Sequence, residues 1–146
     1  MTEYRKPLPS LDDEVTAEYW RAAAEHRLVV PRCVDCGLTF FYPRRYCQAC
    51  WSDNLEWIES AGAGRVWSFT FVHVPFYDEA WEHDVPYCVA LVELDEGVRL
   101  VSNIIGAEQD VLMVGDPVQV VFDDVASGVS LPKFEVRQSE RGEALT

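Results

Sequence analysis

Two Cys-x-x-Cys pairs are the residues of this sequence best suited to chemistry. Cys33 and Cys36 form the first pair, Cys47 and Cys50 form the second, and ten residues separate the pairs. Each pair suits a tight knuckle whose backbone N–H groups point at the sulfurs, and a ten-residue hairpin can bring the knuckles face to face. Because four thiolates around a tetrahedral ion leave no open position, we expect one structural Zn²⁺, with iron as the alternative metal.

Disulfide formation or thioredoxin-like redox chemistry is the alternative use of these cysteines. Neither pair lies between a strand and a helix, where a redox pair is expected. Five cysteines is an odd number, which suits a reducing compartment better than a disulfide framework. The fifth, Cys88, lies in an apolar run and is expected to be an inert core residue.

The one local basic patch of the chain lies around the cysteines. Residues 27–45 contain a single acid, Asp35, and four arginines: Arg27, Arg32, Arg44 and Arg45. A zinc ion with four thiolates has a formal charge of about −2, which nearby arginines can offset. The other interpretation, left open by the sequence, is an anion-binding site.

Charge argues against a nucleic-acid partner. The formal net charge is −13, and residues 47–146 carry all of it, with five Lys or Arg against eighteen Asp or Glu. This half of the chain should repel phosphate backbones. No apolar run is long enough to cross a membrane, and the N-terminus lacks the apolar segment of a secretory signal. We therefore expect a cytoplasmic protein without membrane or nucleic-acid contacts.

The sequence shows no catalytic residues. His26, His73 and His83 are its only histidines, none is arranged for catalysis, and no hydrolase, phosphate-binding or metalloprotease motif occurs. The acidic loop 75–86 carries Trp81 and further aromatic residues among its acids. Such a loop is either a binding element or a segment folded back on the body of the protein.

The pattern of the remaining residues predicts a mainly β protein with one N-terminal helix. A helix is expected over residues 12–26, capped near Ser10 and bearing Tyr19 and Trp20, and β-like runs follow at 28–30, 38–42 and 55–58. Beyond the small residues 60–64, five strands are expected, with one helical turn possible over 107–114. We predict an N-terminal helical segment (1–27), a rubredoxin-like zinc ribbon (28–59), a five-stranded OB-fold barrel (60–138) and a polar tail (139–146).

The chain resembles the zinc-ribbon plus OB-fold proteins associated with acyl-CoA metabolism. The matching elements follow the family order: Tyr19-Trp20, His26 to Cys36-Gly37, Pro43-Arg-Arg, Leu55-Glu-Trp57, Ala63-Gly-Arg, Val85-Pro-Tyr87, Val92 to Leu100, Gly115-Asp-Pro-Val118 and Leu131 to Phe134. The second knuckle departs from the family pattern, because Trp51 follows Cys50 where a glycine is often found.

The resemblance implies a non-catalytic subunit of a hetero-oligomer. Such a subunit docks on a thiolase-like enzyme (thiolase, acyl-CoA aldolase or synthase) and helps to hold the CoA part of an acyl-CoA, here in a degradative pathway for aromatic or steroid compounds. The phosphates of a CoA ester need cationic donors, and its adenine needs a flat apolar surface. The basic patch offers both, so the predicted CoA contacts are Arg32, Phe40, Arg44 and Arg45, with Phe41 and Tyr42 beside them.

Two alternative functions are compatible with this architecture. Zinc ribbons and OB-folds also bind single-stranded nucleic acids, which the acidic barrel half disfavours. A free-standing acyl-CoA-binding protein or hydrolase is the other alternative, and a hydrolase would need a nucleophile that the sequence does not show.

Overall fold

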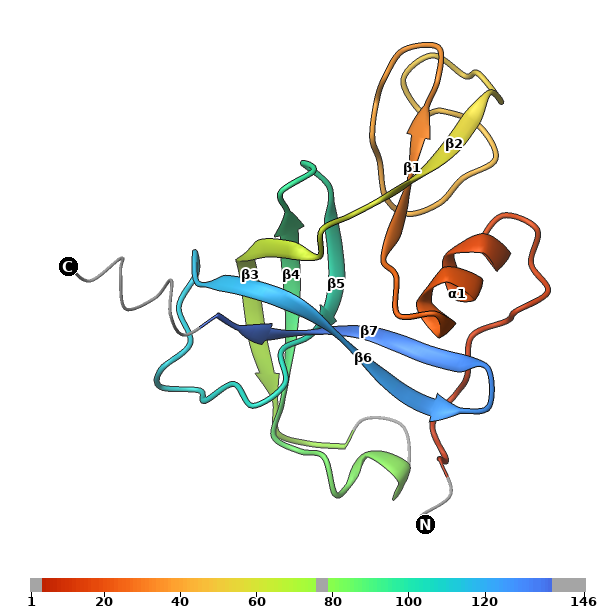
Figure 1. Cartoon of the computed structure of the whole chain (residues 1–146). Coiled ribbons are helices and arrows are strands. Elements are labelled where there is room, and N and C mark those ends of the chain that lie inside the picture. The colour runs from red at the N-terminus through yellow and green to blue at the C-terminus, as the bar shows by residue number, and fades with distance from the viewer. Residues whose placement is uncertain (1–3, 76–78, 138–146) are drawn as a thin grey trace.

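The computed structural model describes residues 4–75 and 79–137 (Figure 1). The chain forms α1 (Ala17–Ala24), β1 (Val29–Cys33), β2 (Leu55–Glu59), β3 (Ala63–Val72), a short 3₁₀ helix η1 (Glu79–Trp81), β4 (Tyr87–Leu94), β5 (Arg99–Asn103), β6 (Pro117–Ala126) and β7 (Val129–Val136). No helix in the described ranges is long and apolar enough to cross a membrane. The polar tail expected at 139–146 lies outside the described residues.

Strands β3 to β7 form one five-stranded antiparallel sheet in the order β5-β4-β3-β6-β7. Its two edge strands approach each other, because Ile104 forms a parallel bridge with Phe134 and the Ile105 N–H donates to the Phe134 carbonyl at 2.7 Å. The Ser102 hydroxyl donates to the Pro132 carbonyl at 2.8 Å at the same seam. The predicted five-stranded, partly open OB-fold is thereby confirmed.

The long strand β3 serves both halves of the barrel. It pairs with β4 from Gly64 to Val72 but with β6 only over 63–65, and a bulge lies between Val66 and Ser68. A bulge increases the local twist of a strand, so one strand can leave one neighbour and follow another.

One hydrophobic core joins the barrel to the segments that precede it. Barrel residues such as Val92, Val118 and Phe134 are fully buried, and Tyr19, Leu28 and Val30 belong to the same cluster. The base of the ribbon therefore packs on the barrel rather than being joined to it by a free linker. The exact domain boundaries at 27 and 59 stay a prediction.

Helix α1 is shorter than the predicted span 12–26. Asp13, rather than Ser10, organises the turn before it, since its carboxylate accepts from the Val15 N–H at 2.8 Å and its carbonyl accepts from the Ala17 N–H at 2.8 Å. At the other end the Arg27 N–H reaches the Ala22 carbonyl at 2.9 Å, with His26 at φ 60°. This is a Schellman ending, in which a left-handed residue stops the helix.

His26 ties that helix end to the β6–β7 hairpin. Its ring stacks on Phe122 with centroids 5.2 Å apart, and its Nε2 lies 2.8 Å from Oδ1 of Asp124. The hydrogen bond with His26 lowers the pKa of the Asp124 carboxyl. The imidazole is thus engaged in holding two elements together.

The segments 38–42 and 107–114 both lack long regular elements. The predicted strand over 38–42 is wrong, because only Thr39 forms a bridge, with Arg32, and the backbone of this segment turns between the two knuckles. Residues 107–114 form a single hydrogen-bonded turn, as expected, with the Leu112 N–H donating to the Glu108 carbonyl at 2.9 Å.

The loop 75–86 is described only in part, since Phe76 and Tyr77 lie outside the described residues. In the described part, Trp81 packs against Tyr87 with ring centroids 5.4 Å apart, and the Lys6 ammonium lies 4.7 Å from the centroid of the Trp81 ring. Lys6 also forms an ion pair with Asp84. This part of the loop is folded back on the barrel.

Candidate metal centre and arginine cleft

The first cysteine knuckle follows strand β1. The Gly37 N–H donates to the Cys33 carbonyl at 2.9 Å, and the Cys33 N–H donates to the Leu38 carbonyl at 2.8 Å. Gly37 has a φ of +78°, a left-handed conformation that glycine adopts without strain. The knuckle is therefore closed by its own backbone.

The second knuckle has the same backbone with a different residue at its turn. The Trp51 N–H donates to the Cys47 carbonyl at 2.8 Å, and the Cys47 N–H donates to the Ser52 carbonyl at 2.8 Å. Trp51 takes the position of Gly37 with a φ of 64°, and it is 76% exposed. The knuckle therefore keeps its geometry without a glycine at this position, but the Trp51 backbone must adopt a strained left-handed conformation.

Strands β1 and β2 bring the two knuckles together. All four cysteine sulfurs lie within 4.8 Å of one another, and the Cys33–Cys50 and Cys36–Cys47 sulfur pairs are 3.6 Å apart. Zinc–sulfur bonds of about 2.3 Å at tetrahedral angles place sulfurs about 3.8 Å apart. The four sulfurs therefore fit one zinc ion, and no other metal-ligand cluster is found within residues 4–75 and 79–137.

Without a cation the four sulfurs cannot all be thiolates at neutral pH. The N–H groups of Cys50 and Ala49 lower the pKa of Cys47 to about 7. The Ser52 N–H also favours the Cys50 thiolate, but the neighbouring Cys33 sulfur and burial outweigh it and raise the pKa of Cys50 to about 12. A bound divalent cation removes this conflict by stabilising every thiolate at once.

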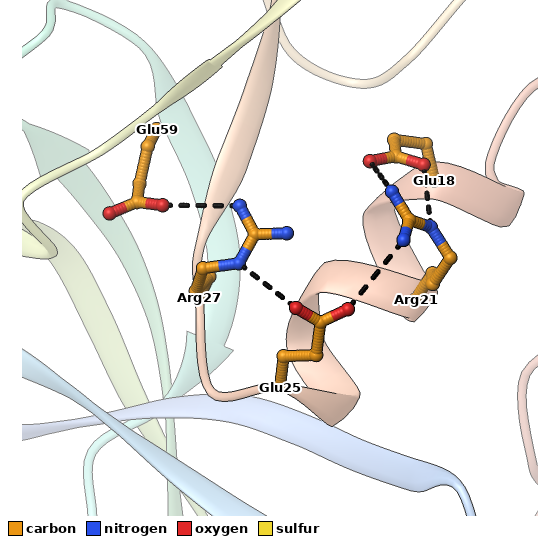
Figure 2. Close-up of polar contacts among 5 residues, drawn as sticks. All are labelled: Glu18, Arg21, Glu25, Arg27 and Glu59. Atoms are coloured by element: carbon orange, nitrogen blue, oxygen red, sulfur yellow. Dashed lines mark hydrogen bonds and ion pairs between the residues drawn. The ribbon is translucent and has the colours of Figure 1, made fainter.

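Three of the four arginines of the basic patch are already paired with carboxylates. Arg27 is part of a chain of ion pairs that runs from Glu18 through Arg21 and Glu25 to Glu59, with Arg27 Nη1 3.2 Å from the Glu59 carboxylate (Figure 2). This chain joins helix α1 to the end of β2. Arg27 is therefore a structural residue.

Arg32 and Arg45 also have acidic neighbours. Arg32 lies 3.8 Å from Glu56 across the β1–β2 pair, and Arg45 lies 3.5 Å from Glu14. In the described part of the chain, Arg44 alone among the four has no carboxylate within 4.0 Å. Carboxylates therefore offset the charge of the three paired arginines.

Arg44 and Arg45 line a small cleft of about 230 Å³ at the junction of the ribbon and the N-terminal segment. Its other lining residues are Glu14, Val15, Pro31, Leu55, Glu56 and Trp57. The sequence did not single out Trp57 for this cleft. Trp57 pairs with Pro31 in the β1–β2 register, and Pro31 lies just beyond the predicted run 28–30, so no sequence signal indicated this pairing.

Phe40 does not line the arginine cleft. Its side chain is only 3% exposed, and its N–H donates to the Pro31 carbonyl at 3.1 Å. The prediction that Phe40 offers a stacking face is therefore wrong for this conformation, because Phe40 fills the inside of the ribbon. Arg32 also does not line the cleft.

An apolar groove of about 320 Å³ lies next to the arginine cleft. It is lined chiefly by aromatic and aliphatic side chains from α1, the ribbon loop and the barrel: Tyr19, Trp20, Phe41, Tyr42, Pro43, Leu100, Val101, Leu131 and Pro132, with Thr16, Ser102, Asn103 and Lys133. The two hollows adjoin, since Val15 and Arg44 line the cleft while Thr16 and Pro43 line the groove. The Tyr42 hydroxyl fixes the groove wall by accepting from the Val101 N–H at 3.2 Å.

No described residue pair resembles a catalytic nucleophile and base. Cys88 is 3% exposed, and burial raises the pKa of its thiol. His26 is occupied by Asp124 and Phe122. The fold and the site thus define a protein built from a four-cysteine zinc ribbon and an OB-fold.

Comparison with known proteins places this architecture in a family. The chain matches the rubredoxin-like zinc ribbon domain of ChsH2 over residues 20–56 and the C-terminal OB-fold domain of ChsH2 over residues 57–123. A DUF35 domain-containing scaffold protein of Methanothermobacter thermautotrophicus is 34% identical over 112 residues, which are 75% of this chain and 83% of the relative. The chain belongs to this ChsH2/DUF35 family.

Two further relatives carry enzyme names. A probable enoyl-CoA hydratase alpha subunit of Thermomonospora curvata is 35% identical over 129 residues, and the match spans 88% of this chain but only 39% of that longer relative. A solved structure named Ltp2-ChsH2(DUF35) aldolase matches with a TM-score of 0.79 and 35% identity, covering 88% of this chain and 98% of the other. The predicted family is therefore confirmed.

Proposed function

We propose that this protein is a non-catalytic, zinc-binding subunit of an acyl-CoA enzyme complex, in which it docks on a thiolase-like enzyme and helps to bind the CoA part of the substrate. The name of the aldolase relative includes a DUF35 protein, and other relatives are named as a scaffold and as a hydratase alpha subunit. The residue resemblance described above implies the thiolase-like partner. Degradation of aromatic or steroid compounds is the pathway class we propose.

The arginine cleft beside the apolar groove is the observation that carries this proposal. A CoA ester has a nucleotide end with phosphates and an opposite end with a less polar arm and acyl group. Arg44, unpaired in the described residues, suits a phosphate, and the wall of Trp20, Phe41 and Tyr42 suits the less polar part. Trp57 and the half-exposed Tyr42 take the stacking role that was predicted for Phe40.

The metal in this proposal is one structural Zn²⁺ per chain. Its four cysteine ligands leave no position for a substrate or water. The zinc therefore orders the ribbon and takes no part in the reaction, which belongs to the partner enzyme.

Exchange of Arg44 for alanine tests the CoA contact. The Arg44→Ala subunit should raise the Michaelis constant of the complex for its CoA substrate about five- to a hundredfold, as expected for loss of a contact worth about 1–3 kcal/mol. Arg5→Ala is the matched control, because Arg5 is an exposed arginine that lines neither hollow. An unchanged Michaelis constant with reduced zinc content would assign Arg44 to the metal site instead.

Co-purification tests the partner. The tagged chain, isolated from its native cell, should bring down a thiolase-like subunit identified by mass spectrometry, and the complex should act on an acyl-CoA. Isolation of the chain by itself, or only with proteins unrelated to acyl-CoA chemistry, would refute the proposed function.

A further inference from the structure

The loop between β5 and β6 exposes an unusual set of large apolar side chains. Ile105, Val111, Met113 and Val114 are 48%, 45%, 64% and 65% exposed. Figure 1 shows this loop on the side of the barrel away from the ribbon, so it is separate from the arginine cleft and the apolar groove. Clustered apolar residues of this size on a surface are typical of sites that contact another molecule.

The loop is held in place by its own contacts. Leu112 is only 6% exposed and anchors the loop in the core, and the buried Asp116 carboxylate accepts from the Met113 N–H at 2.9 Å. The Gly115 N–H donates to the Val66 carbonyl at 2.8 Å, and the Val66 N–H donates to the Asp116 carbonyl at 3.0 Å. The exposed side chains are therefore presented by an ordered backbone, which lowers the entropy lost on binding.

Acidic residues border the apolar side chains. Ile105 and Val111 line a hollow of about 400 Å³ together with Glu108 and Glu135, and Asp110 is exposed in the same loop. Two cations are close to this loop: Arg65, whose Nη1 donates to the Gly115 carbonyl at 3.1 Å, and Arg137, whose N–H donates to the Pro117 carbonyl at 2.8 Å. Acids therefore outnumber bases on the described rim, with Glu108, Asp110 and Glu135 on the acidic side.

We propose that this apolar loop, residues 105–114 with Glu135, is the surface by which the OB-fold docks on its protein partner, whose matching surface is apolar and bordered by Lys or Arg. This inference rests on the proposed function only for the existence of an enzyme partner. The acidic rim selects such a surface by charge complementarity.

The same charges disfavour other occupants of the loop. A second copy of this chain would bring acidic residues against acidic residues, because the half of the sequence that contains the barrel carries the whole net charge of −13. Nucleic acids and anionic lipid surfaces would be repelled for the same reason. A protein with a basic border avoids this repulsion.

A double substitution in the loop tests the docking surface directly. The wild-type chain and the variant Met113→Asp/Val114→Asp are titrated against the purified enzyme subunit that co-purifies with the chain. We expect binding to weaken about tenfold or more in this variant. Val74→Asp, at an apolar side chain that is 72% exposed elsewhere on the molecule, is the matched control and should bind as wild type. Zinc content and circular dichroism establish that all three proteins are folded.

The acidic rim is tested by charge reversal. The variant Glu108→Lys/Asp110→Lys should bind more weakly at low salt, and the difference from wild type should shrink as salt rises. Hydrogen exchange of the wild-type complex should show protection of the amides of residues 108–114 relative to the free chain.

The outcomes separate the two proposals. If the wild-type chain forms no complex with an acyl-CoA enzyme, the proposed function fails, and this inference fails with it. If the complex forms, but the Met113→Asp/Val114→Asp chain binds within twofold of wild type and the loop amides gain no protection, the docking surface is refuted and the proposed function stands.

Discussion

Gly64 marks a place where the barrel tolerates no side chain, so the variant Gly64→Ala should strongly destabilise the OB-fold. Gly64 lies in β3 between Leu94 of β4 and Val118 of β6. A Cβ atom at this position would stand 2.4 Å from the Glu93 carbonyl oxygen and 3.1 Å from the Leu94 Cα. Both obstacles are backbone atoms, which cannot rotate away.

The size of the effect follows from that overlap. An ordinary contact between a methyl carbon and a carbonyl oxygen needs about 3.4 Å, so β3 and β4 must separate by about 1 Å at the point where three strands meet. Overpacking of this kind typically costs about 1–3 kcal/mol, and weakened ladder hydrogen bonds add to it. We expect the free energy of unfolding to fall by about 2–4 kcal/mol.

Urea denaturation followed by tryptophan fluorescence measures this change. With a slope of about 2 kcal/mol per molar urea, the midpoint should fall by about 1–2 M. Zinc content should stay at about one ion per chain, because the knuckle hydrogen bonds lie outside the barrel.

Gly128→Ala is the control for the effect of losing a glycine. Gly128 has a φ of +75° with no atom within 4 Å of a built Cβ, so only the cost of a left-handed alanine applies, about 1 kcal/mol. If Gly64→Ala costs no more than Gly128→Ala, the close approach of β3 and β4 is not a constraint on the fold.

Three further outcomes are expected. Elemental analysis should find about one zinc per chain, and a strong chelator should unfold the ribbon; a folded, metal-free chain with oxidised cysteines would contradict the metal site. The isolated chain should show no thiolytic, hydrolytic or aldol activity, because the described residues contain no nucleophile with a base; turnover that persists after removal of every other protein would contradict this. The variant Trp51→Gly should change the stability of the isolated chain by less than about 1 kcal/mol, because relief of left-handed strain offsets the added freedom of the unfolded chain; a large loss of zinc affinity would show that the indole supports the knuckle.

Local patterns in the sequence were enough to predict the metal ligands and most strands. The cysteine spacing determines the knuckle geometry directly, period-two alternation over residues 66–73 marks β3, and a continuous apolar run marks β4. The segment 38–42 also looked like a strand, yet it follows β1 only over 38–40, through the Arg32–Thr39 bridge and the backbone hydrogen bonds of Leu38 and Phe40, and the chain then turns towards the second knuckle. A run of apolar residues does not by itself provide a neighbouring strand.

The arginine site was predictable only in outline, because its chemistry depends on distant carboxylates. Sequence proximity grouped Arg27 with Arg44, but Arg27 is bound by Glu59, which lies 32 positions away along the chain. The burial of Phe40 likewise depends on how the ribbon closes over it. Only the folded chain shows which cation is left available for a ligand.

The ribbon loop links the proposed structural zinc to the proposed CoA site. Tyr42, Arg44 and Arg45 lie between the two knuckles in a segment without regular secondary structure. Cys36 anchors one end of this segment at the metal and Cys47 anchors the other, while buried Phe40 and the Tyr42–Val101 hydrogen bond hold its middle against the ribbon and the barrel. Because the loop makes few backbone hydrogen bonds of its own, its order depends on these anchors. Under the proposed function, zinc in this site would act on CoA binding only by positioning the arginine cleft and the wall of the apolar groove.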